Sequence, residues 1–310
     1  MLTPVQKEKL YRQQYRLVGE HSAVKICFWT KECLRKGRVC YKQDFYDIHT
    51  ANCLEMSPAI TCNQRCLHCW RDTSVFSSKW VGKADNPKDI IAGCIKERQN
   101  LLVGFPGNKN LDLTKFQKAL IPDHAAISLT GEPCLYPKLP QLIDSFFADF
   151  NFRSVFLVTN GTVPARLKQI GKKSKYFPTN IYLSLEAYDL KSHKQLNNPV
   201  VKDTWIKVQQ SMKYLSKIKN HTRTILRITV IKPFNLDKAA KFLPFIQLMR
   251  PAYIEVKGYG YLGYSCYRLT RDNVPSWDEV QEFAQKLSEV SGYRISGKHQ
   301  LSDIVQLAEI

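Results

Sequence analysis

From about residue 85 onward, short runs of hydrophobic, β-branched residues alternate with longer stretches of helical periodicity. The runs predict strands at 125–129, 154–158, 180–185, 225–231 and 253–257. The helical stretches lie near 87–101, 138–150, 163–171, 200–218 and 236–249. This alternation is typical of βα units and a parallel sheet, and one further strand before residue 62 would give about six units.

Polar and glycine-rich residues follow every one of these strands. They are Thr130-Gly-Glu-Pro133, Thr159-Asn-Gly161, Glu186-Ala-Tyr-Asp189, Lys232-Pro-Phe-Asn235 and Gly258-Tyr-Gly260. In a barrel of βα units the carboxyl ends of the strands share one face, and that face carries the chemistry. The pattern therefore predicts an α/β fold of the partial (βα)6 TIM-type barrel, with its functional residues on that face.

The residues before the repeat form an N-terminal extension. An amphipathic helix is predicted over roughly 3–18, with Leu10, Tyr15 and Leu17 on or near one face. No internal repeat or Gly/Ser linker interrupts the chain. We expect one domain in three parts, which are the extension 1–54, the barrel 55–265 and a C-terminal segment 266–310 packed on the barrel.

Three cysteines, Cys62, Cys66 and Cys69, form the pattern C-x3-C-x2-C and are followed by Trp70. Three thiolates at this spacing can hold three irons of a 4Fe–4S cluster and leave the fourth iron open to a substrate. A zinc site with His68 as fourth ligand is an alternative, although the neighbouring Cys69 makes tetrahedral closure awkward. A coincidental set of core cysteines is the other alternative.

A second set, Cys27, Cys40 and Cys53, is spaced by 13 residues each time, which matches no local zinc or ferredoxin motif. If the extension folds across the barrel mouth, these cysteines could hold a second 4Fe–4S cluster with an open iron. Cys94 shares a predicted helical face with Ile90 and is expected in the core. No chemistry is assigned to the other cysteines.

Lys42 stands two residues after Cys40. A lysine beside a cluster could form a Schiff base with a keto acid. An ordinary lysine is almost wholly protonated at neutral pH, and an anionic cluster nearby favours that form further. Desolvation or a second cation must oppose both effects. The alternatives are a lysine exposed to solvent and one paired with a carboxylate.

The chain carries a net charge of +19, most of it between residues 55 and 265. This excess predicts a polyanionic partner, and a generally basic surface is the alternative. No segment is long and apolar enough for a membrane span, and the first residues lack the apolar region of a secretory signal. Ten cysteines in such a chain favour metal ligation over disulfides, so we expect a cytoplasmic protein.

Together these segments resemble the 4-demethylwyosine synthases, the radical-SAM enzymes of the tRNA wybutosine pathway, in the archaeal form without a flavodoxin domain. The resemblance runs from about residue 18 to residue 275. It rests on His21-Ser-Ala-Val-Lys-Ile-Cys27, Cys40-Tyr-Lys-Gln-Asp-Phe-Tyr46, Cys62-x3-Cys66-x2-Cys69-Trp70-Arg71, Ile127-Ser-Leu-Thr-Gly-Glu-Pro133 and Tyr253-Ile-Glu-Val-Lys-Gly258.

The resemblance implies a substrate and a reaction. The substrate would be tRNA-Phe with N1-methylguanosine next to the anticodon, and pyruvate would donate two carbons. A 5′-deoxyadenosyl radical made from S-adenosylmethionine would take a hydrogen from the N1-methyl group. The carbon radical would add to the keto carbon of pyruvate, and loss of the carboxyl carbon and ring closure would give the tricyclic base. This is a carbon–carbon lyase that needs an external electron donor, and we expect a monomer.

The resemblance also implies roles for single residues. Cys62, Cys66 and Cys69 would hold the cluster that binds S-adenosylmethionine, and Cys27, Cys40 and Cys53 the auxiliary cluster. Thr130, Gly131 and Glu132 would receive the methionine amino group, Asn160 and Ser184 the ribose and carboxylate, and His68 would lie near the adenine. Lys42 matches the Schiff-base lysine. Cys134 and Glu186 depart from the family, which more often has Thr and Asp there.

Two other hypotheses remain from the sequence. One is a different radical-SAM RNA-modifying enzyme, such as a methylthiotransferase, although those place a three-cysteine auxiliary cluster in a much larger N-terminal domain. The other is a zinc-stabilised RNA-binding module, which predicts bound zinc and no acid-labile sulfide.

Overall fold

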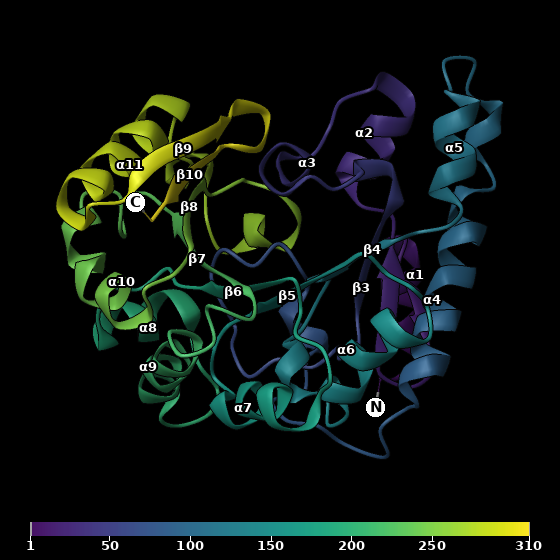
Figure 1. Cartoon of the computed structure of the whole chain (residues 1–310), viewed down its shortest axis with the longest axis horizontal. Coiled ribbons are helices and arrows are strands. Elements are labelled where there is room, and N and C mark those ends of the chain that lie inside the picture. The colour runs from purple at the N-terminus through teal and green to yellow at the C-terminus, as the bar shows by residue number, and fades with distance from the viewer. Residues whose placement is uncertain (1, 310) are drawn as a thin grey trace. The chain divides into compact units, whose positions relative to one another are not determined.

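The structure is a computed structural model that describes residues 2–309 (Figure 1). The chain divides into two compact units, each described by itself. Unit 1 comprises Met1–Thr61, Lys79–Val158 and Gln169–Thr179, and unit 2 comprises Cys62–Ser78, Thr159–Lys168 and Asn180–Ile310.

Unit 1 contains a mixed sheet. Its strands are β1 (Arg16–Val18), β2 (Ser22–Lys25), β3 (Cys53–Ser57), β4 (His124–Ile127) and β5 (Ser154–Thr159), in that spatial order. β1 and β2 are antiparallel, as are β2 and β3, whereas β3, β4 and β5 run parallel. The two strands predicted here from sequence are confirmed within two residues.

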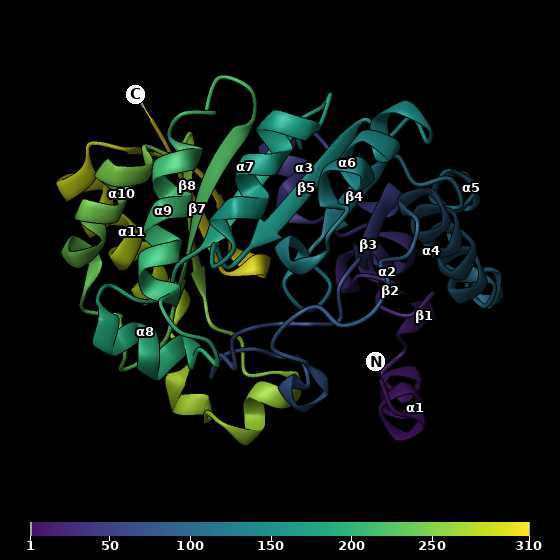
Figure 2. The same ribbon diagram turned by 90° about the horizontal axis from the view of Figure 1, so that it is seen from below.

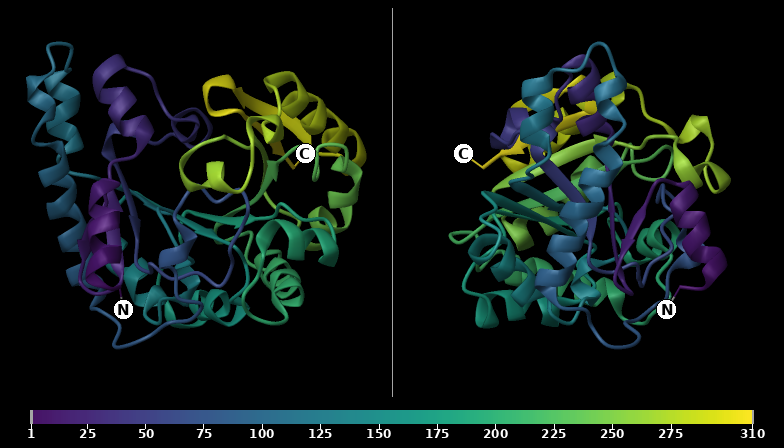
Figure 3. Two further views of the ribbon diagram at one scale, coloured as in Figure 1. Left: turned by 180° about the vertical axis from the view of Figure 1, so that it is seen from behind. Right: turned by 90° about the vertical axis from the view of Figure 1, so that its right-hand side faces the viewer.

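Unit 1 also contains helices, of which α1 (Pro4–Arg12) and α4 (Pro87–Leu102) pack on its strands. The others are α2 (Phe28–Lys36), α3 (Tyr41–Tyr46), α5 (Leu113–Ala119) and α6 (Leu139–Ala148), and α7 (Pro164–Lys173) spans residues of both units. α4 runs along β1, β2 and β3 (Figure 3). Cys94 is fully buried in α4, as predicted.

The N-terminal helix is shorter than the predicted 3–18. α1 ends at Arg12, and Gln14 adopts a left-handed conformation with φ of 65°. The chain then enters β1, whose residue Leu17 pairs with Ala23 of β2. The apolar residues after Gln14 are therefore used by a strand, because backbone pairing with β2 outweighs the helical pattern.

Unit 2 contains the remaining strands of the described residues, which also run in mixed directions. β6 (Asn180–Ser184), β7 (Arg223–Val230) and β8 (Tyr253–Gly258) are parallel, β10 (Ile304–Ala308) is antiparallel to β8, and β9 (Arg294–His299) is antiparallel to β10. Its helices are α8 (Leu190–Asn197), α9 (Thr204–Leu215), α10 (Leu243–Met249) and α11 (Trp277–Ser291), with α10 packed between α9 and α11 (Figure 2). The helices predicted near 200–218 and 236–249 are present but shorter.

Candidate active site

The loop after β3 carries the first cysteine set in unit 2. The Cys62 amide donates to the Ser77 carbonyl at 3.0 Å and the Cys69 amide to the Cys66 carbonyl at 3.2 Å, so the main chain is held at both ends. Burial, together with the negative charge of Glu186 and of the other two cysteines, raises the pKa of Cys66 well above its usual value. Thiolates gathered here need a compensating cation, which the irons of a cluster would supply.

An arginine within the loop fixes its backbone. Arg65 Nη1 donates to the carbonyl oxygens of Cys62 at 2.7 Å and Gln64 at 2.9 Å. These carbonyls therefore have a hydrogen-bond donor within the loop itself, which fixes the main chain between Cys62 and Cys66. A guanidinium also places a positive charge beside a site that would collect thiolates.

A later segment closes over the far end of the loop. A 3-10 turn begins at Gly263, whose φ is 58° and whose position leaves no room for a Cβ against the Trp70 carbonyl. The Tyr264 amide donates to that carbonyl at 2.9 Å. Arg268 Nη2 donates to the carbonyl oxygen of Cys69. The turn thus holds the loop next to its last cysteine.

Side-chain amides reach two of the thiols. Asn197 Nδ2, at the end of α8, lies 3.6 Å from Cys66 Sγ, and Asn160 Nδ2 lies 3.9 Å from Cys62 Sγ. Amide donors to cluster sulfurs are one of the features that set a cluster's reduction potential. Sequence reasoning missed Asn197, because no local motif links it to a cysteine 131 residues away.

Glu186 contacts both Asn197 and His68 next to this cysteine set. Its Oε2 accepts from Asn197 Nδ2 at 2.9 Å, and its Oε1 lies 3.5 Å from His68 Nε2. Burial opposes ionisation of Glu186, but His68 and the Asn197 amide hold the pKa of its carboxyl below the usual value. His68 is therefore oriented by a carboxylate, which is also the residue that departs from the family pattern.

The segment after β4 packs on the chain that leads into the cysteine loop. The Thr130 carbonyl accepts from Ser57 Oγ at 2.5 Å, and the Glu132 amide donates to the Thr61 carbonyl at 2.7 Å. Gly131 has φ of 71°, and a Cβ there would collide with the carbonyl of Thr61. This close approach requires glycine.

Three further residues, Glu132, Asn160 and Ser184, were predicted from the sequence to bind S-adenosylmethionine. The Glu132 carboxylate is buried and accepts from the Cys134 amide at 2.9 Å. Asn160 follows β5, and its Oδ1 accepts from the Thr162 amide at 3.0 Å. Ser184 ends β6 and is half-buried.

The second cysteine set converges within unit 1. One cavity is lined by the three cysteines of the extension and by Lys42, Glu55 and Ser128, among others. The cysteines come from different places, because Cys27 precedes α2, Cys40 precedes α3 and Cys53 opens β3. The spacing of 13 residues in the sequence is therefore brought together by folding, as the second-cluster hypothesis requires.

Burial and neighbouring charges keep two thiols of this cavity in the neutral form. Burial, and then the charge of Glu55, raises the pKa of Cys27 well above its usual value. Burial raises the pKa of Cys53 to about 12, although the charge of Lys42 opposes the shift. Buried neutral thiols ionise when a metal replaces their protons.

Lys42 lies in α3 and is buried, so a lysine exposed to solvent is excluded. Its Nζ lies 4.8 Å from the ring centroid of Phe156. The side chain therefore points into the cavity of the second cysteine set with its ammonium over an aromatic face.

Arg98 supports this site from α4 and was missed in the sequence. Its guanidinium donates to the carbonyl oxygens of Cys53 at 3.2 Å, Ala51 at 2.6 Å and Ala119. The side chain is fully buried, and burial lowers the pKa of Arg98 to about 10. The sequence could not indicate this role, because the partners of Arg98 are backbone carbonyl oxygens, which every residue has.

Among residues 2–309, no group of three or more His, Cys, Asp and Glu side chains is spaced to hold a single metal ion. No helix in this part of the chain has the length and apolarity to cross a membrane.

Two family models match the chain. Residues 56–246 match the radical SAM superfamily, and residues 248–309 match the family of wyosine base formation. The S-adenosyl-L-methionine-dependent tRNA 4-demethylwyosine synthase of Pyrococcus abyssi is 39% identical over 306 residues, which cover 97% of this chain and 88% of that protein. The human synthase TYW1 is 34% identical, over 99% of this chain and 41% of that protein.

Solved structures agree with these matches. The structure of TYW1 with a lysine–pyruvate adduct bound has a TM-score of 0.88 at 30% identity and covers 99% of this chain and 96% of that one. An archaeal TYW1 structure has a TM-score of 0.79 at 28% identity with the same coverage. The radical SAM fold implies a 4Fe–4S cluster and S-adenosylmethionine. The chain belongs to the S-adenosyl-L-methionine-dependent tRNA 4-demethylwyosine synthases, radical-SAM enzymes that form the wyosine base of tRNA.

Proposed function

We propose that this enzyme condenses N1-methylguanosine, next to the anticodon of tRNA-Phe, with the two-carbon unit of pyruvate to form 4-demethylwyosine, and is a carbon–carbon lyase. The observation that carries the proposal is the cavity of unit 1, where buried Lys42 lies among Cys27, Cys40 and Cys53. A related structure is described as holding a lysine–pyruvate adduct, and this cavity has the lysine for such an adduct.

In this proposal, Cys62, Cys66 and Cys69 hold the 4Fe–4S cluster, which supplies the electron that cleaves S-adenosylmethionine. The segment Thr130, Gly131 and Glu132 receives the methionine amino group, because the glycine permits close backbone approach and a carboxylate accepts from an ammonium. Asn160 and Ser184 bind the ribose and carboxylate as short polar groups after β5 and β6. An external donor supplies the electrons.

Cys27, Cys40 and Cys53 hold the second 4Fe–4S cluster in this proposal. Support comes from three thiols around one cavity and from the Arg98 bonds that fix the backbone at Cys53. These three residues would hold the cluster, and a cluster with three protein ligands would offer a Lewis-acidic iron to a substrate such as a keto acid.

Lys42 then forms the Schiff base. A neutral Nζ attacks the keto carbon of pyruvate, one water leaves, and the carbon–nitrogen double bond forms. Nζ must lose a proton before it attacks, and Glu55, which lines the same cavity, can accept it. The covalent bond would hold the keto carbon in place for the methyl-derived radical of the base.

We also propose that the fold acts as a partial (βα)6 barrel. Residues 1–54 carry the auxiliary cluster, residues 55–265 the radical chemistry, and residues 266–310 support the barrel. The pairing of β10 with β8 supports the last assignment. A monomer in the cytoplasm remains the prediction from the sequence.

The experiment that tests this function is nucleoside mass spectrometry. tRNA-Phe bearing N1-methylguanosine is incubated without oxygen with reduced, reconstituted protein, S-adenosylmethionine and pyruvate labelled with carbon-13. A tricyclic base that gains two labelled carbons is expected. Release of 5′-deoxyadenosine without a new nucleoside would reject this substrate pair and leave the radical SAM assignment intact.

A further inference from the structure

A cavity of about 290 Å³ in unit 1 is lined by three cations and no carboxylate. The cations are Arg16 of β1 and Lys31 and Arg35 of α2, and Gln14 and Phe105 are among the other lining residues. This cavity is separate from the cysteine cavity, and neither the predicted site residues nor the comparisons assign it a role.

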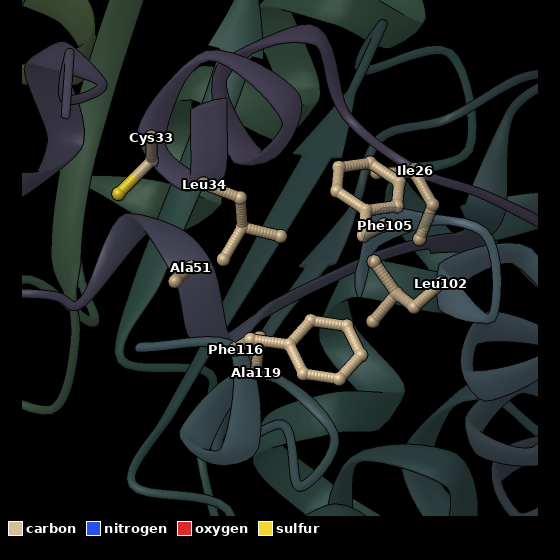
Figure 4. Packing of buried hydrophobic residues seen from close by; sticks show 8 residues of the cluster. All are labelled: Ile26, Cys33, Leu34, Ala51, Leu102, Phe105, Phe116 and Ala119. Carbon is tan, nitrogen blue, oxygen red and sulfur yellow. The ribbon is translucent and has the colours of Figure 1, made fainter. Parts of the chain in front are cut away.

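The cations stand on a rigid base. Lys31 and Arg35 are four residues apart on α2, so they project from the same face of the helix. The adjacent face of α2 packs through Leu34 into a buried cluster that includes Leu102 and Phe105 (Figure 4). The positions of the two charges are therefore fixed by the core of unit 1, and side-chain rotation is their main remaining freedom.

None of the three cations has an ion pair with a carboxylate among residues 2–309. Lys31 Nζ donates to Gln14 Oε1 at 2.6 Å, and Arg35 lies over the Phe105 ring at 5.1 Å. Burial and the charge of Arg35 lower the pKa of Lys31. Like charges one helical turn apart destabilise a helix unless an anion lies between them.

The carboxylate nearest in sequence is used elsewhere. Glu32 lies on α2 beside Lys31, but its Oε2 is 3.5 Å from both Lys36 Nζ and Arg38 Nη1. The chain thus neutralises the neighbouring cations of α2 and leaves Lys31 and Arg35 without an acidic partner. Such an arrangement is expected where the anion comes from a ligand.

We propose that this cavity binds a backbone phosphate of the tRNA substrate. The inference rests on the proposed tRNA modification and names part of its binding surface. A polynucleotide is favoured over a small anion because the protein carries a net charge of +19. The long Lys and Arg side chains can also adjust to the position of a backbone phosphate. Arg35 is eight residues after Cys27, about 12 Å along a helix, so the phosphate belongs to a nucleotide near the modified base.

The test measures tRNA affinity against salt for the holoprotein and for the double variant Lys31→Gln/Arg35→Gln. Each lost phosphate contact lowers the slope of log affinity against log salt by about 0.7 to 0.9. Loss of the one proposed phosphate contact therefore predicts a slope smaller by roughly 0.7 to 0.9 and an affinity lower by roughly 5- to 8-fold near 0.1 M salt. Arg35→Lys should keep most of the slope, because the charge remains.

Lys286→Gln is the matched control. Lys286 is exposed on α11, and its substitution also removes one positive charge. An equal loss of slope per charge in this control would overturn the proposal, because general charge would then explain the effect. An unchanged slope in the double variant would overturn it as well. So would binding of inorganic phosphate that both substitutions abolish while the tRNA slope stays unchanged, since the cavity would then serve a small anion.

Turnover of the same tRNA by the wild-type protein separates this inference from the proposed function. Formation of the tricyclic base with no difference in slope would reject the cavity alone. A normal slope difference without base formation would support phosphate binding and reject the proposed reaction.

Discussion

The side-chain amide of Asn197 lies 3.6 Å from Sγ of Cys66 and 2.9 Å from the Glu186 carboxylate. It therefore connects a proposed cluster ligand to a buried negative charge. The amide donor stabilises electron density on sulfur, whereas the carboxylate opposes it. With Cys66 as a cluster ligand, as proposed, the balance of these two contacts would contribute to the reduction potential of the cluster.

Replacing Asn197 by Leu should therefore make the reduction potential of the first cluster more negative. If the reduced cluster loses about 1 kcal/mol of stabilisation, the potential falls by roughly 40 mV for one electron. Redox titration followed by electron paramagnetic resonance measures the shift. Gln195→Leu removes an exposed amide from the same helix and should leave the potential unchanged. A potential equal to the wild-type value would mean that the amide does not act on the cluster.

The iron content should distinguish one cluster from two. We expect about eight irons per chain after anaerobic reconstitution, and about four in the triple variant Cys27→Ala/Cys40→Ala/Cys53→Ala. Iron and acid-labile sulfide assays give both numbers. Cys94→Ala is the control, because this buried thiol lines neither site. Equal iron in the triple variant and the wild type would remove the second cluster from the account.

Lys42→Arg should abolish base formation and keep the cleavage of S-adenosylmethionine. Arginine retains a positive charge near Cys53 but cannot form a Schiff base with pyruvate. We expect the product to fall by at least about 100-fold, in the range typical of a lost covalent catalyst. Borohydride reduction with labelled pyruvate should mark the wild-type chain alone. Product at the wild-type rate would exclude an essential adduct on this residue.

Arg98→Met should destabilise unit 1 and weaken the second site. The variant leaves the buried carbonyl oxygens of Ala51 and Cys53 without their donor, so the free energy of unfolding should fall by about 3 kcal/mol. Urea unfolding followed by circular dichroism measures the change, and iron analysis should show a loss confined to the second cluster. Lys96→Met, on the exposed side of α4, should change neither quantity. Unaltered stability of the Arg98 variant would contradict its structural role.

Acid should destabilise the protein in part through His193. Burial lowers the pKa of this histidine, whose Nε2 lies 2.9 Å from Thr204 Oγ1. The unfolded chain takes up a proton near pH 6.5, whereas the folded chain resists it, so stability falls as the pH drops below about 6.5. His193→Gln should reduce the loss of melting temperature between about pH 7 and 5.5. Burial also lowers the pKa of His124, so part of the loss should persist. An identical loss in the variant would assign the effect elsewhere.

Local patterns in the sequence predicted most of the parallel strands, because strand runs such as 154–158 are buried and read as continuous apolar segments. The first cysteine set was equally visible, since its three cysteines lie within eight residues of sequence. The contacts that support the two sites could not be predicted from the sequence. Asn197 and Arg98 act through long-range hydrogen bonds, and nothing in their own neighbourhood marks them. The helix predicted over 3–18 failed because β1 gains its stability from pairing with β2, which a periodicity cannot reveal.

The close approach of Gly263 to the Trp70 carbonyl has a consequence for protein engineering. Trp70 lies in the region common to the radical SAM superfamily, and Gly263 lies in the region matched by the wyosine family. The specialised region is thus fitted to the backbone of the generic one at a point where a side chain would not fit. A chimera that transplants residues 248–309 into another radical-SAM scaffold should take the 62–78 loop with it, because the two segments form one transferable piece.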